Sequence, residues 1–389
     1  MRVSPPPNAA PSGDVQGPPT LGILSTYPPT ACGLATFSAA LTSGLVAHGA
    51  DVHVVRIADG SRSSDPRVRG ELVPGSPPSI AASAQLLNRC DVAIIQHEYG
   101  VYGGMDGDDV VDVIGALEIP AVVVAHTVLR DPTPHQRSVL VEVARLAERV
   151  VVMSESARSR LLAGFDVDPA RVVTIPHGAL VPDRMQRPKR AAVPTMLTWG
   201  LLGPGKGIER AIDAMADLRD LRPRPRYVIA GQTHPKVLAA HGDVYRDALA
   251  QQAFDAGVAE SVVFDATYRD VTSLTSLIRS ADVVVLPYDS ADQVTSGVLV
   301  DAVACGRPVV ATAFPHAVEL LSSGAGIVVD HGDPDALASA LRRVLTEPGL
   351  AAHMAAEAAR LAPRMGWPVV AAAYVDLAGH LRTERPALV

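Results

Sequence analysis

The feature of this sequence that most constrains its fold is an alternation of buried strands and amphipathic helices that runs through the chain twice. In the first half, short apolar runs rich in β-branched residues occupy positions 21–25, 92–96 and 121–125, and helical patterns separate them. The second half repeats this pattern between positions 195 and 329. Strands that alternate with helices form parallel sheets covered on both faces, so the sequence predicts two Rossmann-like, doubly wound α/β domains.

Length and composition agree with two soluble domains. The chain has 389 residues, of which 48% are hydrophobic and only 19% are charged, as expected for well-buried sheets. The net charge of −7 provides no basic field for nucleic acid. No apolar run is long enough to span a bilayer, so membrane contact is expected to be peripheral at most. Three cysteines without disulfide or metal spacing favour a reducing compartment, and we expect a cytoplasmic protein.

The pattern also predicts where the domains begin and end. Positions 1–20 are expected to form a flexible tail and positions 183–194, which are rich in proline and basic residues, an interdomain linker. The first domain would then occupy 21–182, the second 195–366, and a terminal helix 367–389.

The stretch from Gln293 to Thr312 has the most informative local pattern. A polar turn precedes a helix that begins at Ser296 and Gly297 and carries Asp301. The N–H groups at the start of a helix are a ready binding site for an anion. The sequence therefore places an anion site next to the strand end that precedes this helix.

A second anion-binding pattern follows the strand at 195–199. Gly200, Gly205 and Lys206 have the spacing of a Walker A loop, but Gly207 stands where that loop needs Ser or Thr to hold magnesium. A P-loop NTPase is therefore the weaker interpretation of this loop.

Polar residues also follow the strands of the first half. Gly33 lies between the first strand and its helix, and His126 ends the strand at 121–125. Glu98, Tyr99 and Tyr102 follow the strand at 92–96; they could bind and stack on a sugar, or equally cover a helix end. Open α/β sheets bind ligands at the carboxyl ends of their strands, so these groups are candidates for a shared site.

From residue 21 to residue 381 the chain resembles retaining glycosyltransferases of family 4, also called group 1, which have the two-domain GT-B architecture. Gln293 and Asp301 stand at the two acidic positions of the family's donor-binding motif, and the G-x-P-V-V turn and strand after them match. Lys206 matches the lysine that neutralises the donor diphosphate, whereas Leu201 stands where the family usually has arginine.

The resemblance implies a fold, an activity and a site. Two Rossmann-like domains would face each other across a cleft, with a C-terminal helix crossing back to the first domain. The protein would transfer a hexose of the mannose or glucose type, with retention and without a metal, from a nucleotide diphosphate sugar to a carbohydrate or glycolipid hydroxyl. Residue roles follow from matched motif positions: catalytic His126, Lys206 and Gln293, and donor-binding Gly33, Lys206, Asp301, Ser296 and Gly297.

Two other functions remain open. Gln293 and Leu201 together favour a sugar-nucleotide-binding protein with weak or no transfer activity. A P-loop NTPase would instead bind ATP only with magnesium. A glycogen phosphorylase-like enzyme shares the fold but has a far longer chain, and it ranks last.

Overall fold

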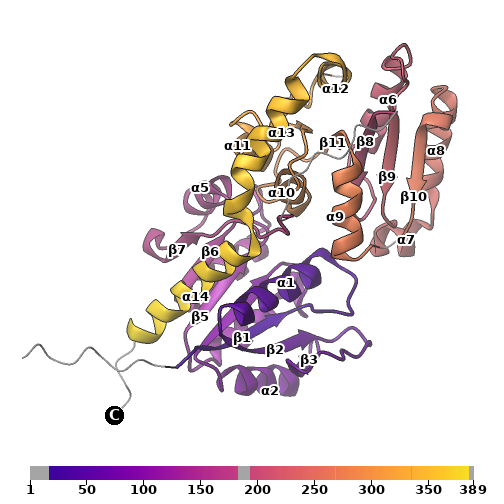
Figure 1. The fold of residues 1–389 in the computed structure, drawn as a ribbon. Coiled ribbons are helices and arrows are strands. Elements are labelled where there is room, and N and C mark those ends of the chain that lie inside the picture. Colours follow the sequence, from indigo (N-terminus) through magenta and orange to yellow (C-terminus); the bar gives the residue numbers. More distant parts are fainter. Residues whose placement is uncertain (1–16, 183–192, 268, 334, 385–389) are drawn as a thin grey trace, which may run out of the picture.

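The computed structural model describes residues 17–182, 193–267, 269–333 and 335–384, and they form two α/β domains joined side by side (Figure 1). Residues 1–16 of the predicted tail and residues 183–192 of the predicted linker lie outside the described residues. The domain boundaries set at those segments remain predictions.

Each domain is built on one parallel sheet. The first sheet has seven strands, in the spatial order β3 (Val68–Leu72), β2 (Asp51–Ile57), β1 (Thr20–Ser25), β4 (Val92–His97), β5 (Ala121–Ala125), β6 (Arg149–Val152) and β7 (Val172–Thr174). The second has six, in the order β10 (Val262–Asp265), β9 (Arg226–Ala230), β8 (Thr195–Trp199), β11 (Val283–Leu286), β12 (Val309–Thr312) and β13 (Gly326–Val329). The strand order reverses between β1 and β4 and again between β8 and β11, so both sheets are doubly wound, as predicted.

Helices cover both faces of each sheet, which explains the nearly continuous apolar strands. In β1, Leu21 and Ile23 point into the core under one face and Leu24 into the core under the other. The helices of the first domain are α1 (Gly33–Ala47), α2 (Pro77–Leu87), α3 (Asp109–Gly115), α4 (Pro134–Leu146) and α5 (Glu155–Gly164). Those that follow are α6 (Ile208–Asp217), α7 (Pro235–His241), α8 (Val244–Asp255), α9 (Val271–Ser280), α10 (Gly297–Ala304), α11 (Pro315–Leu321), α12 (Ala336–Thr346), α13 (Leu350–Leu361) and α14 (Trp367–Glu384).

The last helix returns to the first domain, as the resemblance implied. Helix α14 leaves the second domain and lies along α1, where Val370 and Tyr374 enter the core of the first sheet (Figure 1). At the crossing, the Ala179 N–H donates to the Met365 carbonyl (2.7 Å) and the Trp367 N–H donates to the Ala179 carbonyl (3.2 Å). Two crossings of the chain between the domains are therefore bonded to each other.

In the described part of the chain, no helix is both long enough and apolar enough to cross a membrane.

Candidate active site

The carboxyl ends of β8 and β11 bring two of the predicted loops into contact. The Asp289 N–H donates to the Gly205 carbonyl (3.0 Å), and the Lys206 ammonium lies 4.7 Å from the centre of the Tyr288 ring. Burial lowers the pKa of Lys206, and no carboxylate of the described residues forms an ion pair with it. A partly desolvated cation without a counter-ion is suited to bind an anion.

Gly207 has a geometry that separates this loop from a P-loop. Its φ of +62° lies in the left-handed region, and a Cβ at this position would overlap the carbonyl oxygen of Pro287. Serine or threonine does not fit here without moving the backbone. The structure thus gives a steric reason for the glycine that breaks the Walker A pattern.

Helix α10 begins where the sequence places it, against the first domain. The Ser296 hydroxyl accepts a hydrogen bond from the Leu299 N–H (3.3 Å), while the Ser296 N–H donates to His316 Nδ1 (2.9 Å). A Cβ on Gly297 would lie 2.9 Å from Nε2 of His177, so the helix start abuts the segment that leaves the first domain. Ser296 therefore caps the helix, and its predicted contact with a donor stays a prediction.

Asp301 lies one turn further along α10, on the same side of the helix as Gly297. Burial raises the pKa of its carboxyl group to about 7. None of the hydrogen bonds or ion pairs among the described residues reaches this carboxyl group. It is thus a desolvated acceptor whose hydrogen-bonding capacity is unused.

Gln293 is held in place by the first domain. Its neighbour Val294 is buried in the core of that domain, and the Val294 carbonyl accepts from the Ser154 hydroxyl (2.5 Å). On the other side, Arg160 donates to the Asp292 carbonyl (2.5 Å). The Gln293 side-chain amide donates to the Thr295 carbonyl (3.0 Å), which leaves its side-chain oxygen as an acceptor.

His126 faces the same region from the end of β5. Its Nε2 lies 2.6 Å from Oε1 of Gln96, so this nitrogen carries the proton, and its ring packs edge-on against Phe37 at 4.9 Å. Burial, then the nearby His177 and His97, lowers the pKa of His126 to about 3, so the ring is neutral at pH 7. Its Nδ1 can then accept a hydrogen bond from a hydroxyl group.

Gly33 begins α1, one turn before Phe37, and a Cβ there would meet no atom within 4 Å. The backbone of Gly33 therefore borders open space, one helical turn from the Phe37 ring that packs against His126. Phe37 also contacts His177 at 4.9 Å, and His177 abuts Gly297, so a chain of contacts links Gly33 and His126 to α10.

In the loop after β4, the two tyrosines are core residues, and Glu98 is the residue that can contact a ligand. Tyr99 and Tyr102 are buried, and the Tyr102 hydroxyl donates to the Gln96 carbonyl (2.6 Å), so sugar stacking is not their role. The Glu98 carboxyl group accepts from Thr127 (2.5 Å), the residue after His126. Burial raises the pKa of Glu98, and Lys236 of the second domain opposes that shift. Glu98 is a site candidate for which the sequence left two equal alternatives, binding a sugar or lying in a surface loop that covers a helix end.

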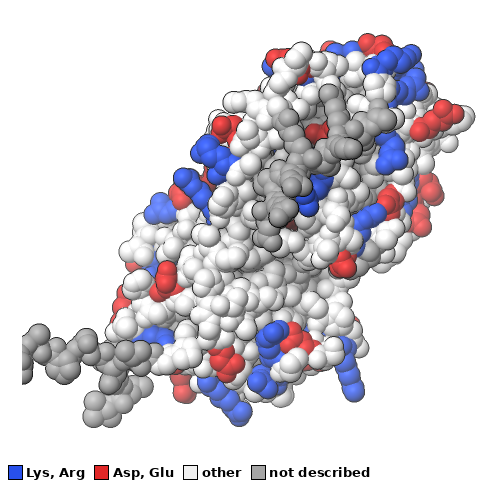
Figure 2. Space-filling model, in the orientation of Figure 1, with Lys and Arg blue, Asp and Glu red and all other residues white. Residues whose placement is uncertain are grey.

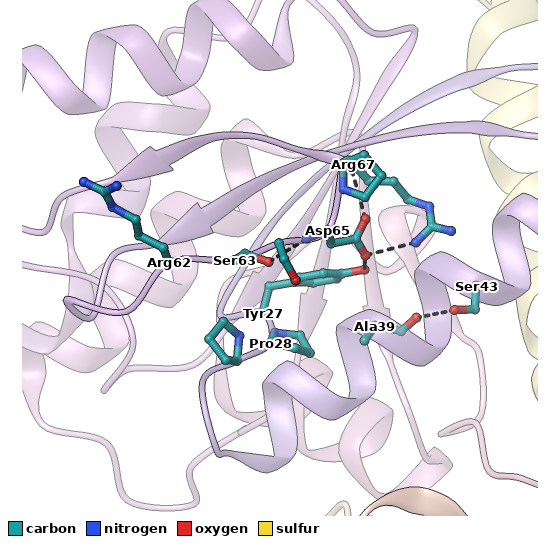
Figure 3. Close-up of a pocket in the computed structure, with 11 residues that line it drawn as sticks. Tyr27, Pro28, Ala39, Ser43, Arg62, Ser63, Asp65 and Arg67 are labelled. Atoms are coloured by element: carbon teal, nitrogen blue, oxygen red, sulfur yellow. Dashed lines mark hydrogen bonds and ion pairs between the residues drawn. The ribbon is translucent and has the colours of Figure 1, made fainter.

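A separate cavity of about 410 Å³ lies in the first domain, between the loop after β1, the outer side of α1 and the segment that follows β2 (Figure 3). Its wall is organised by Asp65, which accepts from the Tyr27 hydroxyl (3.0 Å) and pairs with Arg67 (3.0 Å). The fully buried Arg56 ties the two loops together by donating to the carbonyl groups of Tyr27 (3.2 Å) and Ser61 (2.7 Å). No predicted site residue lines this cavity.

Surface charge is mixed. Figure 2 shows Lys and Arg interspersed with Asp and Glu on one face, with no extended basic tract. Within the described ranges, no group of three His, Cys, Asp or Glu residues is placed to hold a metal ion.

Comparison with known proteins identifies the family. The model for "Glycosyl transferases group 1" matches residues 183–361, and the model for "Glycosyltransferase Family 4" matches residues 31–179. The chain belongs to glycosyltransferase family 4. Together the two models reach both predicted domains and all the predicted site residues.

Curated glycosyltransferases resemble the chain over part of their length. A D-inositol 3-phosphate glycosyltransferase of Kineococcus radiotolerans is 30% identical over 270 residues, which are 63% of this chain and 60% of that protein. A GDP-mannose-dependent alpha-(1-6)-phosphatidylinositol monomannoside mannosyltransferase of Mycolicibacterium smegmatis is 30% identical over 256 residues, 62% of this chain and 64% of that protein. The matched region thus spans less than two thirds of these relatives.

Solved structures of the same architecture confirm the GT-B fold. A sucrose-phosphate synthase from Thermosynechococcus elongatus has a TM-score of 0.73 at 17% identity, covering 94% of this chain and all of that one. HepE of Anabaena in complex with UDP has a TM-score of 0.73 at 18% identity, covering 93% and 100%.

Proposed function

We propose that this family 4 chain is a retaining glycosyltransferase that moves a hexose of the mannose or glucose type from a nucleotide diphosphate sugar to a hydroxyl acceptor. One observation carries the proposal. Lys206, in the loop after β8, and Asp301, in the helix after the neighbouring strand β11, are a cation and a carboxyl group that form no ion pair among the described residues. A nucleotide diphosphate offers the complement of both, because its diphosphate is anionic and its ribose has a diol.

Each predicted site residue then has a task. Negative charge develops on the departing diphosphate during transfer, and Lys206 stabilises it. The N–H groups at the start of α10, near Ser296 and Gly297, and the backbone of Gly33 contribute donors from either side. Asp301 accepts from the ribose. The Gln293 side-chain oxygen and His126 Nδ1 accept hydrogen bonds from the sugar hydroxyls. In this proposal the charge on the leaving group is neutralised without a metal.

The relatives suggest which acceptors to test first. The names of the two relatives described above both contain an inositol group: D-inositol 3-phosphate and a phosphatidylinositol mannoside. We therefore propose an inositol-bearing carbohydrate or glycolipid as the first acceptor to try, with the protein in the cytoplasm and touching the membrane peripherally at most.

The test is calorimetric titration of UDP, GDP, ADP and ATP, each with and without magnesium, against the wild type, Lys206→Ala and the surface control Arg360→Ala. Tight binding of one nucleoside diphosphate that survives removal of magnesium, and weakens by about a hundredfold in Lys206→Ala only, is expected. ATP binding that requires magnesium would refute the proposal in favour of an NTPase. Transfer with retention is then checked by NMR, from the anomeric configuration of the product.

A second function, donor binding with little transfer, is favoured by one contact. The Gln293 amide is tied to the Thr295 carbonyl, and an amide carries no charge to stabilise a positive sugar centre. Nucleotide binding without product, restored to turnover by Gln293→Glu, would support this alternative over the transferase.

A further inference from the structure

The cations at the carboxyl-end edge of the second sheet differ in whether a carboxylate accompanies them. Arg210 pairs with Asp289 (3.0 Å), and Arg269 pairs with Asp265. Lys206 and Arg246, in contrast, form no ion pair with any described carboxylate. Lys206 has its task in the proposed function, whereas Arg246 has none yet.

Arg246 is held at this edge with donor capacity to spare. It comes from the first turn of α8, and its Nη2 donates to the Gly231 carbonyl (3.1 Å), just beyond β9. Its guanidinium lies 5.8 Å from the centre of the Phe264 ring in β10. Its Nε is buried and has no hydrogen-bond partner in the described structure. Because a buried unpaired donor is costly, this arrangement is better suited to a state with a ligand bound.

The segment under Arg246 is bonded to the loop that carries Leu201 and Lys206. The Gly200 N–H donates to the Ala230 carbonyl (3.0 Å), and the Leu202 N–H donates to the Gln232 carbonyl (2.8 Å). Gly231 packs so closely on Gly200 that a Cβ would overlap the Gly200 carbonyl oxygen. The guanidinium of Arg246 is thus anchored next to the backbone on which the family usually places an arginine.

We infer that Arg246 supplies the second positive charge on the donor diphosphate, the charge that Leu201 does not provide. The inference rests on the proposed function, since it concerns the leaving group of the same donor. A guanidinium fork can donate two parallel hydrogen bonds to phosphate oxygens, and the ring of Phe264 supports it from behind. Arg246 thereby contacts the group on which negative charge develops.

The experiment compares two ligands with the same base. The nucleoside diphosphate that the wild type binds and its phosphate-free nucleoside are titrated into the wild type, Arg246→Gln, Arg246→Lys, Arg246→Gln combined with Leu201→Arg, and the distant surface control Arg342→Gln. We expect Arg246→Gln to weaken the diphosphate at least about tenfold, and to change nucleoside affinity by less than about twofold. Lysine should restore part of the loss, and Leu201→Arg most of it.

The outcomes separate the two proposals. A wild type that binds no nucleoside diphosphate would defeat the transferase and this inference together. A wild type that binds, with Arg246→Gln unchanged or with equal losses for both ligands, would overturn only the role of Arg246. If Arg246→Gln loses its native circular dichroism, Arg246→Met keeps the aliphatic contact with Phe264 and takes its place. Unfolding of both variants would assign Arg246 a structural role and overturn the inference.

Discussion

At the scale of single residues, the site keeps polar groups partly buried and unpaired before any ligand arrives. Asp301 is the clearest case, because burial raises its pKa to about 7 and none of the hydrogen bonds among the described residues compensates. Ionising this carboxyl group therefore costs folding stability, and a ligand hydroxyl would return part of that cost. Functional residues often conflict with stability in this way.

Replacing Asp301 with asparagine should raise stability in a pH-dependent way. A carboxyl group whose pKa is raised by folding contributes stability that is present below its unfolded pKa near 3.8 and is lost as pH rises through about 7. The melting temperature of Asp301→Asn relative to the wild type should therefore be higher at pH 8 than at pH 5. The exposed Asp376→Asn is the control for an equal change in charge. A difference that is constant with pH would contradict the burial argument.

The asparagine variant should also bind nucleotide more weakly. Its amide keeps one acceptor oxygen but loses the charge that strengthens a hydrogen bond from ribose, so we expect about a tenfold loss of nucleoside affinity. Calorimetry with the nucleoside alone measures this loss without any contribution from the diphosphate.

Gly207 and Gly205 form a matched pair for testing the loop. Both have positive φ, +62° and +89°, but only a Cβ at Gly207 would overlap the Pro287 carbonyl, whereas Gly205 borders open space. Gly205→Ser should cost about 1 kcal/mol for its backbone conformation, and Gly207→Ser clearly more. Urea unfolding measures both. Equal costs, or magnesium-dependent ATP binding gained by Gly207→Ser, would refute the steric account.

At the scale of elements, the start of α5 is completed by the second domain. The Glu319 carboxylate on α11 accepts from the backbone N–H groups of Glu155 (2.9 Å) and Ser156 (2.7 Å). Ser154 caps the helix by accepting from the Ala157 N–H (2.9 Å) while its hydroxyl donates to Val294. One helix end of the first domain therefore fixes the segment next to Gln293.

Removing the Glu319 carboxylate, which caps α5 from the second domain, should lower stability and raise the KM for the donor. Glu319→Ala takes a carboxylate from a helix N-terminus, and we expect a loss of about 1–2 kcal/mol in the free energy of unfolding. The donor KM should rise more than kcat falls, because the domains hold Gln293 less firmly. Glu347→Ala, which removes an exposed glutamate paired with Arg343 on α12, is the control. Lost stability with an unchanged donor KM would show that the contact is only structural.

Sequence reasoning succeeded for elements with a strong local signal. The apolar strands and the α10 motif have such signals, and the structure confirms them. Strand β3 was missed because Arg69, Gly70 and Glu71 interrupt its apolar pattern at an edge of the sheet. The anchoring of Val294 in the first domain and the Glu319 cap join residues far apart in the sequence, so no local pattern reports them.

The same limit applies within the site. Matched motif positions of the family indicated Lys206, His126 and Asp301 as candidates, whereas nothing in the sequence distinguishes Arg246 from other helical arginines. What distinguishes Arg246 is its buried Nε without a hydrogen-bond partner in the described structure, and only the three-dimensional structure shows this. Sequence likewise could not tell that Tyr99 and Tyr102 turn into the core.

At the scale of the whole molecule, buried histidines should make the protein sensitive to acid. Burial lowers the pKa of His97, His177 and His316 to about 4 and that of His126 to about 3. Each contributes stability that is present above the unfolded pKa of 6.5 and is lost as pH falls toward about 4, by up to about 1.4 kcal/mol per pH unit. Asp301 acts in the opposite sense over the same range, but the histidines outnumber it.

The measurement is the free energy of unfolding in urea between pH 8 and pH 4. We expect it to fall below pH 6.5, with a shallower fall in His316→Asn, since that variant removes one titrating ring while retaining an acceptor near the Ser296 N–H. The exposed His241→Asn is the control. A flat profile down to pH 4 would contradict the assignment of neutral, buried rings.

The return of α14 to the first domain also affects how the chain can fold as it is made. Val370, Tyr374 and Leu381 complete the core beside β1 and α1, yet the ribosome produces them only after every strand of the second domain. During synthesis, one apolar face of the first sheet therefore stays uncovered while the second domain is made. A nascent chain halted before α14 should therefore bind a chaperone at that face until the helix is made.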